Sequence, residues 1–193
     1  MESTVDFKNV LKAIQEQQVK SFYSLNVFKE FLATKRRGMY WIWTKLSWDE
    51  LEQIQTKELT KEVPIAELVR MRQKLNNICT IKNGDYRIVY NGIGGYRTES
   101  KSFGLRERIN QELNCNNERT GTLNIKNRNP ETVSCDARQW ESQWAVSFFD
   151  FDEQGSADIL ASHGFGTDSY NQYAHDLELS WRIEFGVPIL NRI

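Results

Sequence analysis

Cysteine and long apolar stretches are scarce in this chain. Its three cysteines, Cys79, Cys115 and Cys135, do not have the spacing of a zinc knuckle. We expect them to be reduced thiols, buried or inert, as in cytosolic proteins. No segment approaches the roughly 20 apolar residues that a membrane-spanning helix needs. The first residues include Glu2 and Asp6 with no apolar run behind them, so we expect no cleavable signal peptide. These absences predict a soluble, intracellular protein.

The chain also lacks an overall excess of positive charge. It has 25 Lys and Arg against 26 Asp and Glu, which gives a formal net charge of −1 and disfavours a generic polyanion binder. The charges are nevertheless uneven along the chain. Residues 29–37 and 97–138 are richer in Lys and Arg than in acids, whereas residues 141–181 contain acids and no Lys or Arg. A basic face built from the first two regions would permit DNA binding.

What the chain does contain is enough apolar material for a core. Hydrophobic residues make up 39% and charged residues 26% of the 193 positions, close to ordinary globular usage. Six Trp, seven Tyr and ten Phe supply bulky side chains, which we read first as core. This length suits one domain with elaborations.

Periodicity predicts alternating helices and strands. Apolar residues at three- and four-residue spacing predict a helix over 3–33, and the aromatic run 39–44 predicts a buried strand. Ser47 with Glu50 forms a capping-box pattern. The further elements expected are a helix over 48–58, a helix after Pro64, a hairpin of 78–81 with 86–90 around Asn83-Gly84, a helix over 103–114, a strand near 121–126 within turn-rich 117–139, a strand over 144–151 and a helix over 168–185.

These elements predict an α+β fold with a small mixed central β-sheet flanked by helices. We expect residues 1–37 to form an N-terminal helical arm. Residues 38–193 would form the main domain, with a helical insertion at 47–78.

Four short patterns follow one another along this main domain. They are Gly38-Met39-Tyr40, Tyr90-Asn91-Gly92, Leu105-Arg106-Glu107-Arg108, and Glu178 followed by Pro188 and Asn191. Each pattern alone is common by chance, but their order resembles that of the GIY-YIG nuclease family. The resemblance covers residues 38–44 and 86–193.

The resemblance implies metal-dependent hydrolysis of phosphodiester bonds in DNA. Such a reaction needs a base to activate water and positive charge to stabilise the phosphate. By resemblance, Tyr40 is the general base, Tyr90 belongs to the second motif, and Arg108 binds phosphate. Glu178 would hold Mg²⁺ or Mn²⁺, and Asn191 would be a structural or phosphate-side contact. For Tyr40 to act as a base, neighbours should lower its pKa from about 10.

The chain departs from the family pattern in two places that bear on mechanism. Many family members carry His or Tyr four residues after the Arg, whereas this chain has Glu112. Glu112 would therefore take the proton of the tyrosine, or act as a second metal ligand, or the base mechanism differs. Tyr40 and Tyr90 are also separated by the predicted helical insertion. The Gly-rich stretch 92–95 lacks the spacing of a nucleotide-binding loop.

Several alternatives remain open at this point. Tyr40 alone reads as core, Arg106 competes with Arg108, and Glu184 and Asp176 compete with Glu178. His175 lies three residues before Glu178 but has no third zinc ligand in sequence, so a surface histidine is favoured.

Two functions follow. The first is a metal-dependent DNA endonuclease of restriction, mobile-element or phage origin, acting as a possible homodimer. The second is a binding or regulatory module that keeps the scaffold without catalysis, which the near-neutral charge and Glu112 favour. For the nuclease, the candidate phosphate contacts are Arg36, Arg37, Arg97, Lys101, Arg119, Lys126 and Arg128.

Overall fold

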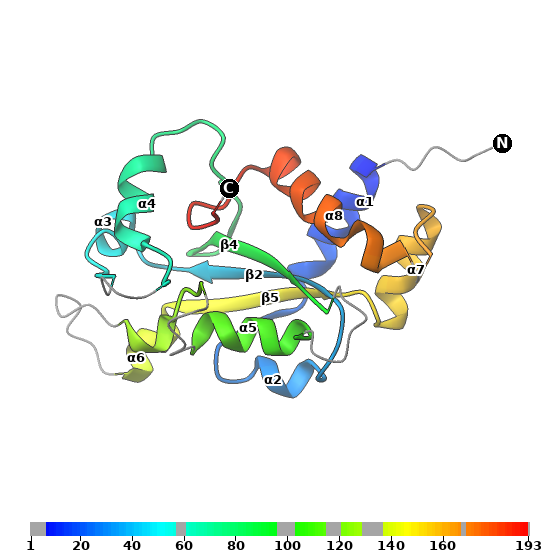
Figure 1. Ribbon diagram of the computed structural model, residues 1–193, viewed down its shortest axis with the longest axis horizontal. Coiled ribbons are helices and arrows are strands. Elements are labelled where there is room, and N and C mark those ends of the chain that lie inside the picture. The colour runs from blue at the N-terminus through cyan, green and yellow to red at the C-terminus, as the bar shows by residue number, and fades with distance from the viewer. Residues whose placement is uncertain are drawn as a thin grey trace.

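A five-stranded antiparallel sheet forms the centre of the protein (Figure 1). The computed structural model describes residues 7–56, 61–95, 103–114, 121–128, 137–166 and 169–192. The strands are β1 (Phe22–Ser24), β2 (Gly38–Thr44), β3 (Lys82–Asn83), β4 (Tyr86–Gly94) and β5 (Trp144–Asp150), in the order β1-β5-β2-β4-β3. The α+β class is confirmed. The expectation of a mixed sheet is wrong, because every strand pair described is antiparallel.

The middle strand β2 separates two apolar clusters. All seven of its residues are buried, and successive side chains point to opposite faces of the sheet. Tyr40 and Ile42 belong to one cluster, whereas Met39, Trp41 and Trp43 belong to the other. This two-sided burial explains why the run is aromatic and aliphatic without polar alternation.

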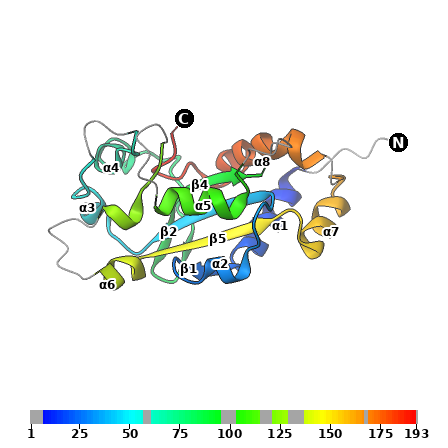
Figure 2. The same cartoon turned by 60° about the horizontal axis from the view of Figure 1, so that its bottom comes forward.

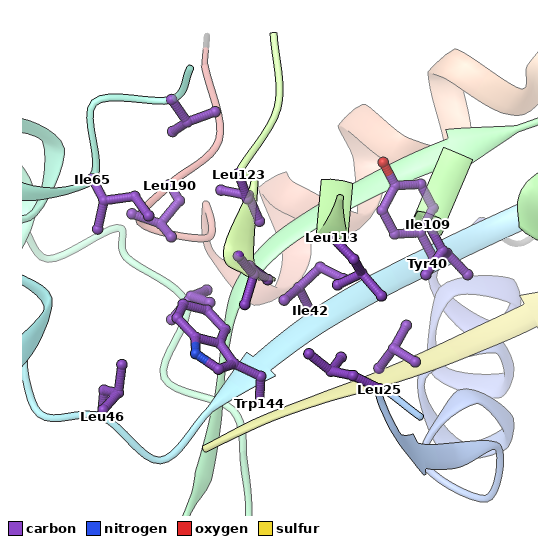
Figure 3. Close-up of a cluster of buried hydrophobic side chains, with 14 of the residues drawn as sticks. Leu25, Tyr40, Ile42, Leu46, Ile65, Ile109, Leu113, Leu123, Trp144 and Leu190 are labelled. Atoms are coloured by element: carbon purple, nitrogen blue, oxygen red, sulfur yellow. The ribbon is translucent and has the colours of Figure 1, made fainter. Parts of the chain in front are cut away.

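Helices cover both faces, so the molecule has three layers (Figure 2). On the Tyr40 face lie α2 (Phe28–Phe31), α4 (Ile65–Arg72) and α5 (Leu105–Leu113), together with Ile189 and Leu190. Figure 3 shows the Tyr40 ring among these aliphatic side chains, with its hydroxyl turned away from them. On the Trp41 face lie α1 (Phe7–Gln18), α7 (Gln154–Ser162) and α8 (Ser169–Phe185).

The single helix predicted over 3–33 is wrong. Helix α1 ends at Gln18, and β1 then pairs with β5 at the edge of the sheet. The aromatic pair in β1 faces opposite sides, as strand residues do: Phe22 packs on Trp43, and Tyr23 stacks on Phe148. Phe22 and Tyr23 fit the apolar spacing of a helix in the sequence. In the structure they lie on opposite faces of the sheet, as successive residues of a strand do. The division at residue 37 separates segments that share one sheet and contribute to both apolar clusters.

Several later elements agree with the sequence, and others do not. Helices α5 and α8 and strand β5 lie where they were predicted. The Ser47–Glu50 capping box is present, although the helix that it opens, α3 (Trp48–Leu51), is short. The strand predicted near 121–126 is wrong, since Thr122 makes one isolated bridge and a 3₁₀ turn, η1 (Ile125–Asn127), follows. Helices α6 (Ala137–Ser142) and α7 were not predicted.

The predicted hairpin is present, but its first strand is Lys82–Asn83 and not 78–81. Asn83 pairs with Tyr86, so the two turn residues are Gly84 and Asp85, and Gly84 has a φ of +57°. The segment before it, at Ile78, makes a parallel bridge to Val187 instead of continuing the ladder.

Candidate active site around Glu112

The carboxylate of Glu112 contacts three of the predicted site residues. Its Oε1 accepts hydrogen bonds from the hydroxyls of Tyr40 at 3.2 Å and Tyr90 at 3.3 Å. Arg108 Nη2 lies 3.5 Å from the same oxygen. The second oxygen, Oε2, accepts the backbone N–H of Leu123 at 3.0 Å. Glu112 is fully buried and hydrogen-bonded at both oxygens, as a buried carboxylate must be to avoid a large desolvation cost.

The pairing of β2 with β4 brings the two phenols together. Tyr40 lies opposite Gly92 and Ile42 lies opposite Tyr90, so both tyrosines project from the same face, with ring centroids 6.2 Å apart. The Tyr40 ring crosses over Gly92. A Cβ at position 92 would lie 2.5 Å from the Tyr40 hydroxyl oxygen. Glycine is therefore needed at position 92 for the Tyr40 ring to lie there.

Helix α5 delivers both Arg108 and Glu112, because residues four apart lie on one side of a helix. Its first turn packs closely on the end of β4: a Cβ at Gly94 would meet the Leu105 Cα at 2.6 Å. This close approach fixes the height of α5 over the sheet. Arg106 projects elsewhere and reaches the Leu32 carbonyl at 3.5 Å, so of the two arginines it is Arg108 that lies at the tyrosines.

The electrostatics of this cluster oppose ionisation of the phenols. Burial raises the pKa of Tyr40 well above its usual value, and the charge of Glu112 raises it further. The pKa of Tyr90 is raised for the same two reasons, in the same order. The condition set for Tyr40 to act as a base, a pKa lowered by its neighbours, is therefore not met in this arrangement. The phenols are protonated donors, and Glu112 is their acceptor.

Arg108 and Glu112 respond to burial in different ways. Burial raises the pKa of Glu112, although the charge of Arg108 opposes this. Burial acts to lower the pKa of Arg108, but Tyr40 and Glu112 outweigh it and the pKa of Arg108 is raised. The guanidinium stays charged, and its side chain is 29% exposed. It is the one member of the group with positive charge and access to an incoming phosphate.

Glu178 lies beside this cluster, on α8. Its Oε1 forms an ion pair of 2.6 Å with Arg182, one helical turn further on. Burial raises the pKa of Glu178, against the charges of Arg182 and Arg108. Its own charge acts on both Tyr40 and Tyr90. Its competitor Glu184 lies 3.6 Å from Lys8 instead.

Asn191 has a structural position. Its Nδ2 donates to the Asn91 carbonyl at 2.7 Å, and its Oδ1 accepts the Asn91 N–H at 2.9 Å. Arg182 Nε binds the Asn91 side chain at 2.9 Å. Asn191 is 2% exposed, so it holds β4 next to Tyr90 and does not face a substrate.

The donor set fits a metal ion only in part. No group of three or more His, Cys, Asp or Glu side chains suited to a metal occurs in the described part of the chain. Mg²⁺ needs only one or two carboxylates when substrate phosphate and water complete its shell. Glu178 could serve in that way, because its side chain keeps 13% exposure. Glu112 is not placed to be a second ligand here, since it has 0% exposure and both of its oxygens accept hydrogen bonds from the protein.

The predicted DNA contacts are mostly engaged within the protein. Arg36 binds Asp150 at 2.7 Å, and Arg37 binds Asp152 through its guanidinium and its backbone N–H. These pairs tie the start of β2 to the end of β5. Lys126 lies 3.4 Å from Glu141 with an exposed side chain.

The expectation that Arg128 contacts DNA is wrong. Its side chain is 3% exposed and lies 2.8 Å from Glu62 Oε2, with a further bond to the Val63 carbonyl. It joins the segment after α5 to the segment before α4 and cannot contact DNA. Arg97, Lys101 and Arg119, like Cys115 and Cys135, lie outside the described residues. Cys79 is buried and free, and burial raises the pKa of its thiol to about 11.

Two residues near the site were not singled out from sequence. Arg182 neutralises Glu178, and its i,i+4 spacing is a signal that could have indicated it. Asn91 links α8 and the C-terminal segment to β4, for which the sequence gives no local signal.

No family model, curated protein or solved structure matched this chain when it was compared with them. Within the described ranges, no helix is both long and apolar enough to cross a membrane.

Proposed function

We propose that this protein is a metal-dependent endonuclease that hydrolyses phosphodiester bonds in DNA. The observation that carries the proposal is the convergence of Tyr40, Tyr90 and Arg108 on one buried carboxylate. They come from three separate segments whose order resembles that of the GIY-YIG family. Glu178 lies close enough to influence both phenols.

In this proposal each side chain has one task. Arg108, charged and partly exposed, binds the phosphate oxygens and stabilises the charge that develops on them. Tyr40 takes a proton from water as it gives its own to Glu112 Oε1, to which its hydroxyl already donates. The raised pKa of Glu112 makes its carboxylate a stronger base for that proton. Glu178 would hold Mg²⁺ or Mn²⁺, which supplies Lewis-acid stabilisation of the leaving oxygen.

A second candidate is a DNA-binding or regulatory module that keeps this scaffold without cutting. Complete burial favours it, because Tyr40 and Glu112 both have 0% exposure. A base that water cannot reach does not act, so catalysis requires this site to open when substrate binds.

Nicking of a supercoiled plasmid with Mg²⁺ or Mn²⁺ tests the proposal. We expect the wild type to nick and Tyr40→Phe, Arg108→Ala and Glu178→Ala each to lose about 100-fold or more in rate. Glu184→Ala, on the same helix as Glu178 but paired with Lys8, is the matched control and should cut normally.

Two outcomes would decide against parts of this reading. A wild type that binds DNA and never nicks it would exclude the endonuclease and favour the DNA-binding module. A wild type that nicks, with all three variants equally active, would place the active site elsewhere.

A further inference from the structure

Three cations lie in α5 and in two segments that adjoin it, one bonded to Arg106 through Leu32 and one bonded to the end of α5 through Asn127 and Asn114. They are Lys29 in α2, Arg106 in the first turn of α5 and Lys126 in η1. Helices α2 and α5 both pack into the apolar cluster on the Tyr40 face of the sheet, with α2 below α5 in Figure 1. The bond from Arg106 Nη1 to the Leu32 carbonyl joins them. We call these three residues the α5 basic cluster.

The charges of this cluster act on one another. Burial lowers the pKa of Lys29, and the positive charges of Lys126 and Arg106 lower it further. Both lysines are exposed, and Arg106 is partly exposed. Like charges that act on one another in this way are unfavourable in the free protein, so an anion that binds near all three would be bound favourably.

Few acids neutralise the cluster. Lys126 shares Glu141 at 3.4 Å, but neither Lys29 nor Arg106 forms an ion pair with a carboxylate in the described ranges. The arginines first expected to bind DNA, such as Arg36 and Arg128, are by contrast paired with Asp150 and Glu62. Of the residues first expected to contact DNA, Lys126 belongs to this cluster, whereas Lys29 and Arg106 were not among them.

We propose that the α5 basic cluster docks the phosphate backbone of duplex DNA. This inference rests on the proposed function and extends it by naming the surface that receives the substrate. Helix α5 carries Arg106 towards the cluster and Arg108 towards the tyrosines. A helix with its side chains is about 10–12 Å across, so a duplex lying over α5 spans both sides. Such contacts position DNA without reading its sequence.

The test is the binding of a fluorescently labelled duplex at a series of salt concentrations, with EDTA present to prevent cutting. The variant is Lys29→Ala/Arg106→Ala/Lys126→Ala. The slope of log K against log salt is negative, and each lost phosphate contact reduces its magnitude by about 0.9, so we expect the magnitude to decrease by about 2.7. At low salt, affinity should fall by about 10-fold or more.

The matched control is Lys12→Ala/Lys74→Ala/Lys82→Ala, which removes the same charge from exposed positions on other elements. It should bind as the wild type does. Equal losses in both triple variants, or no loss in the cluster variant, would overturn the proposal, as would a wild type that binds no duplex. If the cluster variant does not fold, Lys29→Ala/Lys126→Ala keeps the Arg106 bond and should reduce the magnitude of the slope by about 1.8.

The assay separates this proposal from the nuclease reading. Loss of binding in the cluster variant, with a wild type that never nicks, would support the docking surface and refute the endonuclease. Nicking by the wild type, with unchanged binding in the cluster variant, would support the endonuclease and refute the docking surface.

Discussion

The residue with the greatest influence on the site is Glu112. A carboxylate stands where the resemblance led us to expect His or Tyr, and it accepts bonds from both phenols and a backbone N–H. An ionised carboxylate can only accept, whereas a neutral imidazole both donates and accepts. This chain can therefore hold two tyrosines on one acceptor oxygen, which a single histidine nitrogen would accommodate poorly.

Glu112→Gln tests the raised pKa of this carboxyl. Because burial raises the pKa in the folded state, the native protein holds this proton more tightly than the unfolded chain does. The resulting stabilisation is complete below the unfolded pKa of about 4.3 and is lost as pH rises through the folded pKa. Gln cannot ionise, so the variant should gain stability relative to the wild type as pH rises. Urea unfolding at several pH values measures this difference.

The variant carries a second, pH-independent effect. Its amide NH₂ must face either the Leu123 N–H or the phenol hydroxyls. Two donors then oppose each other and a hydrogen bond is lost, which costs about 1–3 kcal/mol. Glu184→Gln makes the same chemical change away from the tyrosines and should follow the wild-type curve. If the difference in unfolding free energy between Glu112→Gln and the wild type does not change with pH, the pKa of Glu112 is not raised in the folded protein.

At the scale of elements, the contact between β2 and β4 determines where the tyrosines lie. Gly92→Ala would place a methyl group 2.5 Å from the Tyr40 oxygen, so the ring or the strand must shift. We expect a loss of about 1–3 kcal/mol in unfolding free energy, as for other overpacked cores. Thermal or urea unfolding measures it.

The control for that variant is Gly155→Ala in α7. A Cβ at position 155 meets nothing within 4 Å, and Ala is favoured over Gly in a helix by about 1 kcal/mol. This change should be neutral or stabilising. Equal effects of the two substitutions would show that the space around Gly92 is not restrictive.

The attachment of the C-terminal segment to β4 is the second element-scale feature. Asn191→Ala removes both side-chain bonds to the Asn91 backbone. The Asn91 N–H then loses its side-chain acceptor, and the Asn91 carbonyl keeps only the 3.5 Å bond from Arg182 Nη2. We expect a loss of about 1–3 kcal/mol and faster hydrogen exchange at the Asn91 amide. Asn76→Ala, at an exposed asparagine, is the control. Unchanged exchange at Asn91 in the Asn191 variant would contradict the role given to this clamp.

At the scale of the whole molecule, the N-terminal segment belongs to the sheet. Strand β1 covers the outer edge of β5, and Val10, Leu11 and Ile14 of α1 fill the cluster on the Trp41 face. An uncovered β5 would expose unpaired backbone groups and aromatic side chains, a hazard for aggregation.

Deletion of residues 1–27 tests this integration. The truncated chain should lose its cooperative thermal transition, followed by circular dichroism, because an edge strand and one side of a core are gone. A chain that begins at Phe7, the first residue of α1, is the control and should unfold as the full chain does. If the shorter chain unfolds cooperatively near the full-length midpoint, the N-terminal segment is dispensable to the fold.

Local patterns accounted for much of the fold. The aromatic run of β2, the helical spacing of α5 and α8 and the Ser47–Glu50 capping box depend on neighbours a few residues away, and each lies where it was expected. Strand β1 was missed because two adjacent aromatic residues fit both periods. The loss of Arg128 as a DNA contact could not be foreseen, since its partner Glu62 lies far back in the chain.

The order of residue types along this chain determined which side chains were candidates for one site: two tyrosines, an arginine and two glutamates. Only the tertiary structure decided their state. It buried Tyr40 against a carboxylate 72 residues away, raised its pKa and left Arg108 partly exposed. Ionisation and access depend on what surrounds a group in space, and those surroundings come from elements that are distant in sequence.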